Sequence, residues 1–257
     1  MLYKYRIPNH EKLIIMTYCV GMKMDDGIVM VSDSRTNAGL DNVSTYKKMF
    51  THAVGDRCIV IVTSGNLSTS QHVFKTLKND INSNNITNSL NTCKNFDEIA
   101  DYVGQISWNH SKTDGISFNT HLGSNFIIGG QIQGQDPDLM MVYPVGNYIR
   151  ASEIKPFFQL GETKYGKPIL DRLIRNETEL GDAARCALVS FDSTMKSDLT
   201  VGPPIDLIVY KKDSLQISQE EHLQFKTPFF SDLSSKWSEG LRNLFKELPK
   251  FDWEKDK

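Results

Sequence analysis

The sequence predicts an α+β fold with layered, mostly antiparallel sheets, and three observations carry this prediction. A hairpin signal stands near the start of the chain, the helical segments come in pairs between groups of strands, and 39% of the residues are apolar. A doubly wound nucleotide-binding fold would instead alternate single strands with single helices. Because 257 residues show no internal repeat and no Gly-, Ser- or Pro-rich linker, we expect one domain.

The first predicted strands precede any helix. Short β-type runs over Thr17–Met24 and Gly27–Asp33 are joined at Asp-Asp-Gly, which is a typical hairpin turn. The segment Arg57–Thr63 is too short and too rich in β-branched residues to favour a helix, so it predicts a buried strand.

Two helical segments follow, and the strands and helices then return. Apolar residues recur at helical spacing within Ser68–Ile81, where Ser68 is suited to cap the N-terminus, and a second helix is expected over about Asp97–His110. The remaining patterns predict strands over Asn125–Gln133, Leu139–Tyr143, Tyr148–Ala151 and Ile205–Tyr210, and helices from Gly161–Thr163 through Arg175, over Leu180–Thr194 and around Leu233–Phe245.

The charge balance argues against polyanionic partners. Lys and Arg total 29 against 31 for Asp and Glu, so the net charge of −2 provides no broad attraction to nucleic acid or to an anionic membrane. No stretch approaches the roughly 20 apolar residues of a membrane helix, and the start of the chain lacks the small-residue cleavage site of a secretion signal. We therefore expect a cytoplasmic protein without nucleic-acid or membrane partners.

The sequence predicts no cofactor and no metal site. The four cysteines form no CxxC pair, and the six histidines show no H-x-x-x-H spacing. The glycines at 129, 130 and 134 match no phosphate-binding fingerprint, and no G-x-S-x-G nucleophile elbow is present.

A small group of residues has the types that nucleophilic catalysis needs. Thr17 stands at the head of the first predicted strand, Asp33 at the end of the second, and Lys48 follows soon after. Taken singly, each also has an ordinary structural explanation: a threonine in a strand, an aspartate in a turn and a lysine on the surface. Their surroundings are more specific, because the segments Thr17–Arg35, Lys47–Phe50, Thr63–Asn66 and Ser197–Gly202 resemble the proteasome β-subunit family of N-terminal-nucleophile hydrolases, and most of all its bacterial Anbu branch.

This resemblance extends from Thr17 to about Tyr210 and implies a fold. It implies a four-layer αββα sandwich with an extra C-terminal helix. It also implies three parts: an extension over residues 1–16, a proteasome-like domain over 17–230, and an amphipathic helix and tail over 231–257.

The resemblance implies a role for each site residue. The hydroxyl of Thr17 attacks a carbonyl while the α-amino group of the same residue takes its proton. A nearby ammonium favours the neutral amine and the developing alkoxide, and this place falls to Lys48, held by Asp33. Gly65 corresponds to the glycine of the oxyanion hole, and Asp198 to the aspartate that supports the amine.

The adjacent lysine, Lys47, is the alternative to Lys48. Neighbouring residues on a strand point to opposite faces, so only one of the two can face the site. The family match favours Lys48.

Thr17 can work in this way only as the first residue of the chain. An α-amino group with a pKa of about 8 is a competent base at cellular pH, whereas an amide nitrogen is not basic. Met16 directly precedes Thr17, and methionine aminopeptidases cut before small second residues. We therefore hypothesise that translation begins at Met16, or alternatively that residues 1–16 are removed as a propeptide.

Two positions depart from the family pattern. Glu162 stands where the family has a serine after the glycine that opens the third helix, and Val201 stands where it has a serine three residues after Asp198. Thr200 could supply a hydroxyl from the neighbouring position. We expect a threonine peptidase or amidase of weak or narrow activity on peptide or amide substrates, and the alternative is a non-catalytic assembly subunit.

The tail from residue 231 to 257 carries more apolar surface than a lone terminal helix usually leaves in water. These side chains either dock onto the subunit's own core or meet another subunit. Together with the resemblance, they predict a homo-oligomer much larger than a dimer, built as a closed ring or an open helix. The large apolar residues are Leu233, Trp237, Leu241, Leu244, Phe245, Leu248, Phe251 and Trp253.

Overall fold

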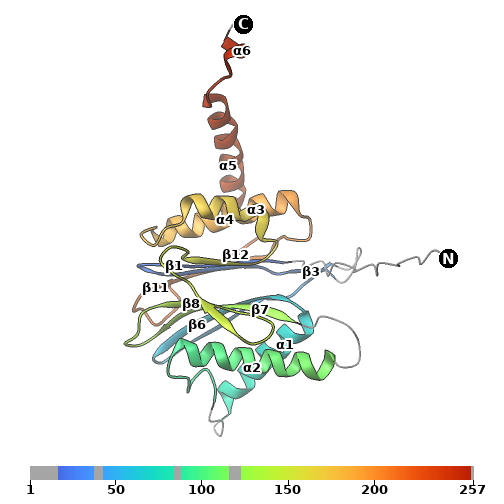
Figure 1. The fold of residues 1–257 in the computed structure, drawn as a ribbon, viewed down its shortest axis with the longest axis vertical. Coiled ribbons are helices and arrows are strands. Elements are labelled where there is room, and N and C mark those ends of the chain that lie inside the picture. Colours follow the sequence, from blue (N-terminus) through green and yellow to red (C-terminus); the bar gives the residue numbers. More distant parts are fainter. Residues whose placement is uncertain (1–16, 38–42, 84–87, 116–122, 256–257) are drawn as a thin grey trace, which may run out of the picture.

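The computed structural model describes residues 17–37, 43–83, 88–115 and 123–255. Two sheets lie face to face, and a pair of helices covers the outer face of each (Figure 1). Every strand pairing recorded in them is antiparallel. The predicted αββα sandwich with an extra C-terminal helix is therefore confirmed.

The first sheet has five strands in the order β10-β1-β2-β11-β12. The predicted hairpin is its centre, since Val20 lies opposite Val31 in the register of the two strands. The bounds are β1 Tyr18–Met24, β2 Gly27–Asp33, β10 Phe157–Gly161, β11 Ile205–Lys211 and β12 Gln219–Leu223.

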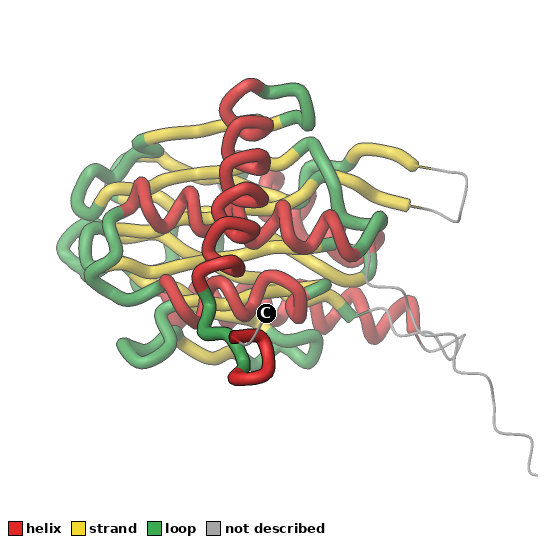
Figure 2. The backbone as a smooth tube through the Cα atoms, turned by 90° about the horizontal axis from the view of Figure 1, so that it is seen from above, coloured by secondary structure: helices red, strands yellow, loops and turns green. Residues whose placement is uncertain are grey.

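The second sheet has five strands in the order β5-β6-β7-β8-β9, and a separate two-stranded ribbon joins β3 to β4. Seen from above, this ribbon reaches beyond the edge of the layers (Figure 2). The bounds are β3 Arg35–Asn37, β4 Val43–Thr45, β5 Met49–Val54, β6 Arg57–Gly65, β7 Ser124–Ile132, β8 Asp138–Val142 and β9 Tyr148–Arg150.

The helices α1 and α2 cover the second sheet, and α3 and α4 cover the first (Figure 1). The prediction of Ser68 as the N-cap is wrong: the cap of α1 is Asn66, two residues earlier, whose side-chain oxygen accepts a hydrogen bond from Thr69 N at 3.2 Å. Asparagine caps as well as serine does, and the turn out of β6 places it first. The bounds are α1 Leu67–Asn82, α2 Phe96–Gly115, α3 Thr163–Leu173, α4 Leu180–Ser197, α5 Pro228–Glu247 and α6 Asp252–Lys255.

Three apolar clusters of the described residues fill the spaces between the layers. Alternate residues of one strand enter different clusters: Ile59 and Ile61 of β6 face α1 and α2, whereas Val60 and Val62 face the other sheet. A strand buried on both faces needs apolar residues at every position, which explains the continuous β-branched run seen in the sequence.

Gly166 allows α3 to pass close to the buried ring of Tyr18. A Cβ at this position would overlap the Tyr18 hydroxyl oxygen and lie 3.0 Å from Ser190 Cβ. The ring cannot move aside readily, because its hydroxyl donates to Ser190 Oγ at 3.2 Å and accepts from Gln159 Nε2 at 2.5 Å.

We therefore expect Gly166→Ala to lower the free energy of unfolding by about 1–3 kcal/mol through overpacking. Urea denaturation of the purified variant measures this. The control is Gly240→Ala in α5, where an added Cβ meets nothing within 4 Å and helix propensity favours alanine by up to about 1 kcal/mol. Equal stability of the Gly166 variant and the wild type would contradict the close approach of α3 to Tyr18.

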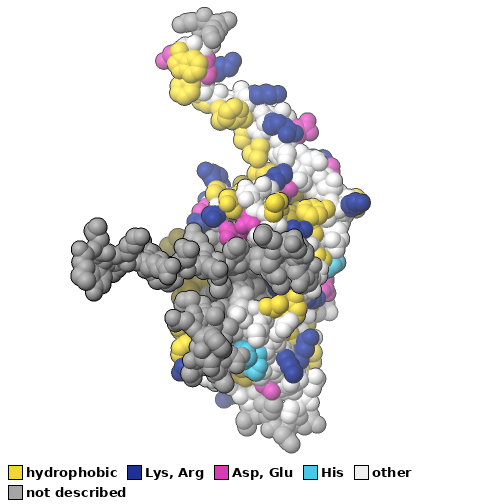
Figure 3. Space-filling model, turned by 90° about the vertical axis from the view of Figure 1, so that its right-hand side faces the viewer, with side chains coloured by type: hydrophobic (Ala, Val, Ile, Leu, Met, Phe, Trp, Pro, Cys, Tyr) yellow, Lys and Arg dark blue, Asp and Glu magenta, His cyan; other side chains and the backbone are white. Residues whose placement is uncertain are grey.

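The helix α5 projects from the four layers, and its first half lies against α4, where Ser234 donates to Asp192 and Ser238 accepts from Lys196 (Figures 1 and 2). Phe230 near its start is buried, and Leu233 packs on the core beside it. Trp237 is half-buried, and from Leu241 onward the large apolar side chains are exposed and form a yellow line along the projecting helix in Figure 3. The exposed ones are Leu241, Leu244, Phe245, Leu248, Phe251 and Trp253.

Among the described residues, the start of the tail therefore packs on the subunit's own core, and the rest of the tail does not. None of the described helices is long and apolar enough to cross a membrane.

Candidate active site

A single buried carboxylate oxygen, that of Asp33, holds two side chains that were predicted to belong to its site, Thr17 and Lys48. Asp33 Oδ1 accepts hydrogen bonds from Thr17 Oγ1 at 3.1 Å, from Tyr18 N at 3.2 Å and from Lys48 Nζ at 2.8 Å. All of these residues are almost completely buried. The threonine hydroxyl and the lysine ammonium are therefore held on the same atom.

The topology explains how residues so far apart in sequence meet here. Thr17 directly precedes β1 and Asp33 ends β2, and the antiparallel pairing of these strands brings the two ends together. Lys48 comes from the other sheet, where it directly precedes β5 and its carbonyl accepts from Thr63 N at 3.1 Å. The lysine thus spans the space between the two sheets.

The two adjacent lysines have different surroundings. The Lys48 side chain is 8% exposed, whereas Lys47 is 54% exposed and pairs with Glu220 at 3.6 Å. The sequence placed the two lysines on a strand, where neighbouring side chains point to opposite faces. Both instead precede β5, so the loop that leads into β5 buries Lys48 and exposes Lys47.

The electrostatics of the site rest on a buried ion pair. Burial raises the pKa of Asp33, while the Lys48 ammonium and the hydrogen bonds from Tyr18 and Thr17 act to lower it. Lys48 Nζ has a second acceptor, the Arg35 carbonyl oxygen at 2.5 Å. Two acceptors on one ammonium fix its position beside the threonine.

Ser34 stands in the chain between Asp33 and Arg35, the two residues that supply the acceptors of Lys48. The sequence did not reveal which group holds it there. Ser34 N donates to the Pro204 carbonyl at 2.8 Å, and Ser34 Oγ donates to Asp206 Oδ2 at 2.7 Å. The other oxygen of Asp206 contacts His222 Nδ1 at 2.7 Å. Asp206 lies 172 residues beyond Ser34, and no local pattern links them.

Gly65, the last residue of β6, offers a backbone N–H on the side of the strand where Lys48 lies. The N–H groups of alternate strand residues point the same way, and that of Thr63 reaches the Lys48 carbonyl. The pairing of β5 with β6 starts at Met49 opposite Val62, so among the described residues no strand carbonyl faces the Gly65 N–H. Glycine is required by its φ of +121° and because a Cβ would lie 2.6 Å from the Gly123 carbonyl oxygen.

The backbone of Thr17 is fixed from a third direction. Its carbonyl oxygen accepts from Glu162 N at 2.9 Å. Gly161, with a φ of +80°, precedes this contact, and a Cβ there would overlap the same carbonyl oxygen. Through this bond Glu162, where the resemblance implies a serine, lies directly beside Thr17, and its carboxylate pairs with Lys164 at 3.5 Å.

Asp198 has a different kind of environment. It follows α4, and its Oδ1 accepts from Thr200 N at 2.8 Å and from Thr200 Oγ1 at 2.5 Å. Among the described residues, the recorded hydrogen bonds of this carboxylate stay within its own turn. The Thr200 hydroxyl is directed to Asp198, and Val201 is buried in the core between α4 and the first sheet.

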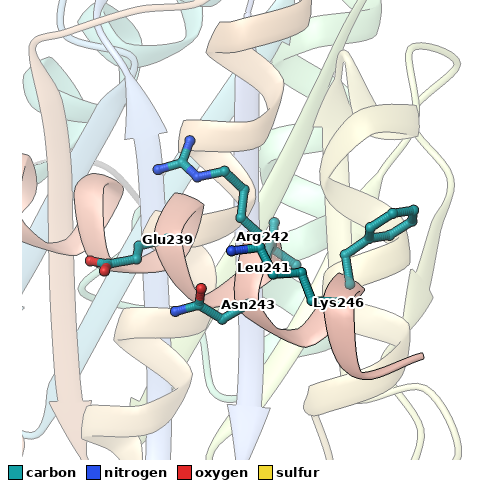
Figure 4. Close-up of a pocket in the computed structure, with 6 residues that line it drawn as sticks. Glu239, Leu241, Arg242, Asn243 and Lys246 are labelled. Atoms are coloured by element: carbon teal, nitrogen blue, oxygen red, sulfur yellow. The ribbon is translucent and has the colours of Figure 1, made fainter.

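The described residues contain no group of three His, Cys, Asp or Glu side chains that could hold a metal. The described residues also line several surface hollows. One runs along α5, lined by Glu239, Leu241, Arg242, Asn243, Phe245 and Lys246 (Figure 4).

The sequence and the fold of this chain are similar to those of known proteins. The family model described as "Proteasome subunit" matches residues 17–210. Anbu (ancestral beta-subunit) from Yersinia bercovieri has a TM-score of 0.87 and 37% identity, covering 92% of this chain and 99% of its own. The helical assembly of the Anbu complex from Pseudomonas aeruginosa has a TM-score of 0.86 and 44% identity, covering 91% of this chain and 98% of its own.

A curated relative from an archaeon is more distant. Proteasome subunit beta 2 of Pyrobaculum calidifontis is 23% identical over 218 residues, which cover 84% of this chain and 98% of that protein.

Proposed function

The chain belongs to the proteasome subunit family, and from this premise we propose that it is a threonine peptidase or amidase with Thr17 as its nucleophile. The observation that carries the proposal is the shared oxygen of Asp33, which holds both the Thr17 hydroxyl and the Lys48 ammonium. The family match also begins at Thr17, the residue that the mechanism needs as the first of the mature chain.

In the proposed mechanism the free α-amino group of Thr17 takes the proton of its own hydroxyl, and Oγ1 attacks the carbonyl carbon of a peptide or amide. The developing oxyanion accepts a hydrogen bond from the Gly65 N–H. The tetrahedral intermediate then breaks the C–N bond, and the leaving amine takes the proton from the α-ammonium group. Water hydrolyses the remaining ester and restores the hydroxyl.

Lys48 favours this sequence in two ways. Its positive charge stabilises a developing negative charge on Oγ1, and it disfavours protonation of the neighbouring amine. Asp33 keeps the ammonium in place and limits the cost of burying it, because the pair is nearly neutral.

The proposal is tested by a peptide epoxyketone, which reacts with both the hydroxyl and the amine of an N-terminal threonine. We expect the intact mass of the native protein to correspond to a chain that starts at Thr17, and the probe to add its mass to the Thr17 peptide. A mature chain that retains residues 1–16, without labelling, would contradict the proposal.

A non-catalytic assembly subunit is the second candidate. It is favoured by the Asp198 carboxylate, whose recorded bonds stay in its own turn, and by Glu162 and Val201, which stand where the resemblance implies serines. A correctly processed chain that the epoxyketone leaves unmodified would support this candidate instead.

We also propose that the chain assembles into a homo-oligomer larger than a dimer. The similar protein from Pseudomonas aeruginosa forms a helical assembly, and here the projecting part of α5 leaves a line of large apolar side chains exposed. We expect a second copy of this chain to cover these side chains, because the same contact between neighbouring copies repeats along such an assembly.

Removal of residues 231–257 is expected to shift the protein to smaller species in light scattering. Because truncation also deletes Leu233, which packs on the core, the sharper variant is Leu244→Ser with Phe245→Ser. The control is Ile154→Ser, which changes an apolar side chain that is 97% exposed outside α5. A wild-type species near the 29.1 kDa of one chain would contradict assembly, and an unchanged oligomer in the double variant would remove α5 from it.

A further inference from the structure

A cluster of buried hydroxyl groups lies directly behind the Gly65 turn. Thr63 of β6, Ser70 of α1 and Ser124 of β7 come from three elements and are almost completely buried. Thr63 Oγ1 and Ser70 Oγ are 2.9 Å apart, and Ser70 Oγ and Ser124 Oγ are 3.2 Å apart. We call these three residues the hydroxyl cluster.

The cluster converges on one backbone oxygen. The carbonyl of Asn66, the residue after Gly65, accepts hydrogen bonds from Ser70 N at 3.1 Å, from Ser70 Oγ at 3.0 Å and from Ser124 Oγ at 2.9 Å. The first of these is the ordinary first bond of a helix, whereas the two side-chain bonds are additional. Asn66 N also donates to the Gly123 carbonyl at 3.2 Å.

The third hydroxyl ties the turn to the sheet. Thr63 Oγ1 donates to the Asn125 carbonyl at 3.1 Å, across the pairing of β6 with β7. Both residues that flank Ser64 and Gly65 in the chain are thereby fixed by hydroxyl groups. The turn cannot rotate without breaking bonds that are buried away from water.

Such a cluster is an unusual way to fill space beside an apolar core. Burying a hydroxyl costs free energy unless it is hydrogen-bonded, and alanine or valine would fill the same volume without that cost. The hydrogen bonds that the hydroxyls make offset this cost, and they hold the turn in a single orientation.

We infer that Ser70 and Ser124 are positioning residues for the oxyanion-binding N–H of Gly65. The inference rests on the proposed function. Ser70 holds the Asn66 carbonyl from α1 and Ser124 holds it from β7, and this orients the end of β6 whose N–H points to the Lys48 side. A correctly aimed donor matters most when charge develops on the substrate oxygen, so its loss lowers kcat more than it raises KM.

The experiment compares the double variant Ser70→Ala/Ser124→Ala with the single variant Ser107→Ala. Each is used as the processed chain that begins at Thr17 and runs to the natural C-terminus. Ser107 is equally buried and its hydroxyl has no hydrogen-bond partner among the described residues, so this control makes the same change without breaking a bond. With a fluorogenic peptide we expect the double variant to lose about tenfold in kcat, as a slightly misplaced group does, with KM changed by less than about twofold. A peptide boronate, whose adduct on Thr17 is tetrahedral, should bind about tenfold more weakly.

Unchanged kcat and boronate affinity in the double variant, with or without a lower melting temperature, would overturn the inference and leave the proposed function standing. If the double variant does not fold, each single variant is expected to lose about threefold in kcat, because one of the two side-chain bonds to Asn66 remains. Equal kcat in both single variants and the wild type would then decide against it.

A second readout does not depend on activity. Amide hydrogen exchange of a peptide spanning residues 64–68 is expected to be at least about tenfold faster in the double variant than in the Ser107 control. If the epoxyketone leaves the wild type unlabelled, the proposed function fails, and this exchange rate still decides whether the hydroxyl cluster fixes the turn. Equal exchange in the two variants overturns the inference.

Discussion

Replacing Thr17 by alanine is expected to lower kcat by at least about 10⁴-fold, because it removes the nucleophilic oxygen and leaves the amine, the lysine and the Gly65 N–H in place. The change deletes one hydrogen bond to Asp33, which is worth about 1 kcal/mol, so folding and assembly should persist. Turnover of a fluorogenic peptide and light scattering of the same sample measure the two expectations together.

Thr17→Ser is the matched control, since it keeps the hydroxyl and removes only a methyl group. It should retain hydrolysis and epoxyketone labelling that the alanine variant lacks. Comparable turnover by the alanine variant and the wild type would exclude Thr17 as the nucleophile.

Replacing Lys48 by methionine is expected to lower kcat by about 10³-fold and also to destabilise the fold. The ammonium that stabilises the Thr17 oxygen is lost, and this is the size of effect seen when one preorganised electrostatic group is removed. Loss of one partner of a buried ion pair costs about 3 kcal/mol, because the Asp33 carboxylate is left in the interior.

The stability loss has a predictable dependence on pH. Without Lys48, burial raises the pKa of Asp33 further above its ordinary value of 3.8. A carboxyl group whose pKa is higher in the folded state binds more protons when folded, so its contribution to stability is present at low pH and is lost as the pH rises through the raised pKa. The deficit of the variant in urea denaturation should therefore be larger at about pH 8 than at about pH 5.

Lys47→Met is the matched control, because this neighbouring lysine is half exposed and pairs with the exposed Glu220. Exposed ion pairs contribute little, so both kcat and stability should stay close to those of the wild type. A severe effect of Lys47→Met with a mild effect of Lys48→Met would show that the lysine assignment is wrong by one residue.

Local patterns in the sequence located much of the fold. The hairpin of β1 and β2, the β-branched run of β6 and the paired helices were all predicted, since burial on one or both faces leaves a periodic trace in the chain. The strands β3, β4, β5, β10 and β12 were missed. The edge strand β12 is mostly polar and exposed, so it carries no apolar period, and only its pairing with β11 makes it a strand.

The sequence by itself identified the candidate site residues Thr17, Asp33, Lys48 and Gly65. Each lies at or beside the end of a strand, in a short segment that resembles the proteasome β-subunit family, so the segment can be recognised without the tertiary structure. Only the tertiary structure decided that one oxygen of Asp33 holds both the hydroxyl and the ammonium, and that Asp206 holds Ser34 across 172 residues. It also decided that Ser70 and Ser124 meet at Asn66, and that the Asp198 carboxylate bonds within its own turn. These contacts depend on the order in which strands pair within and between the sheets, and that order leaves no trace in local periodicity.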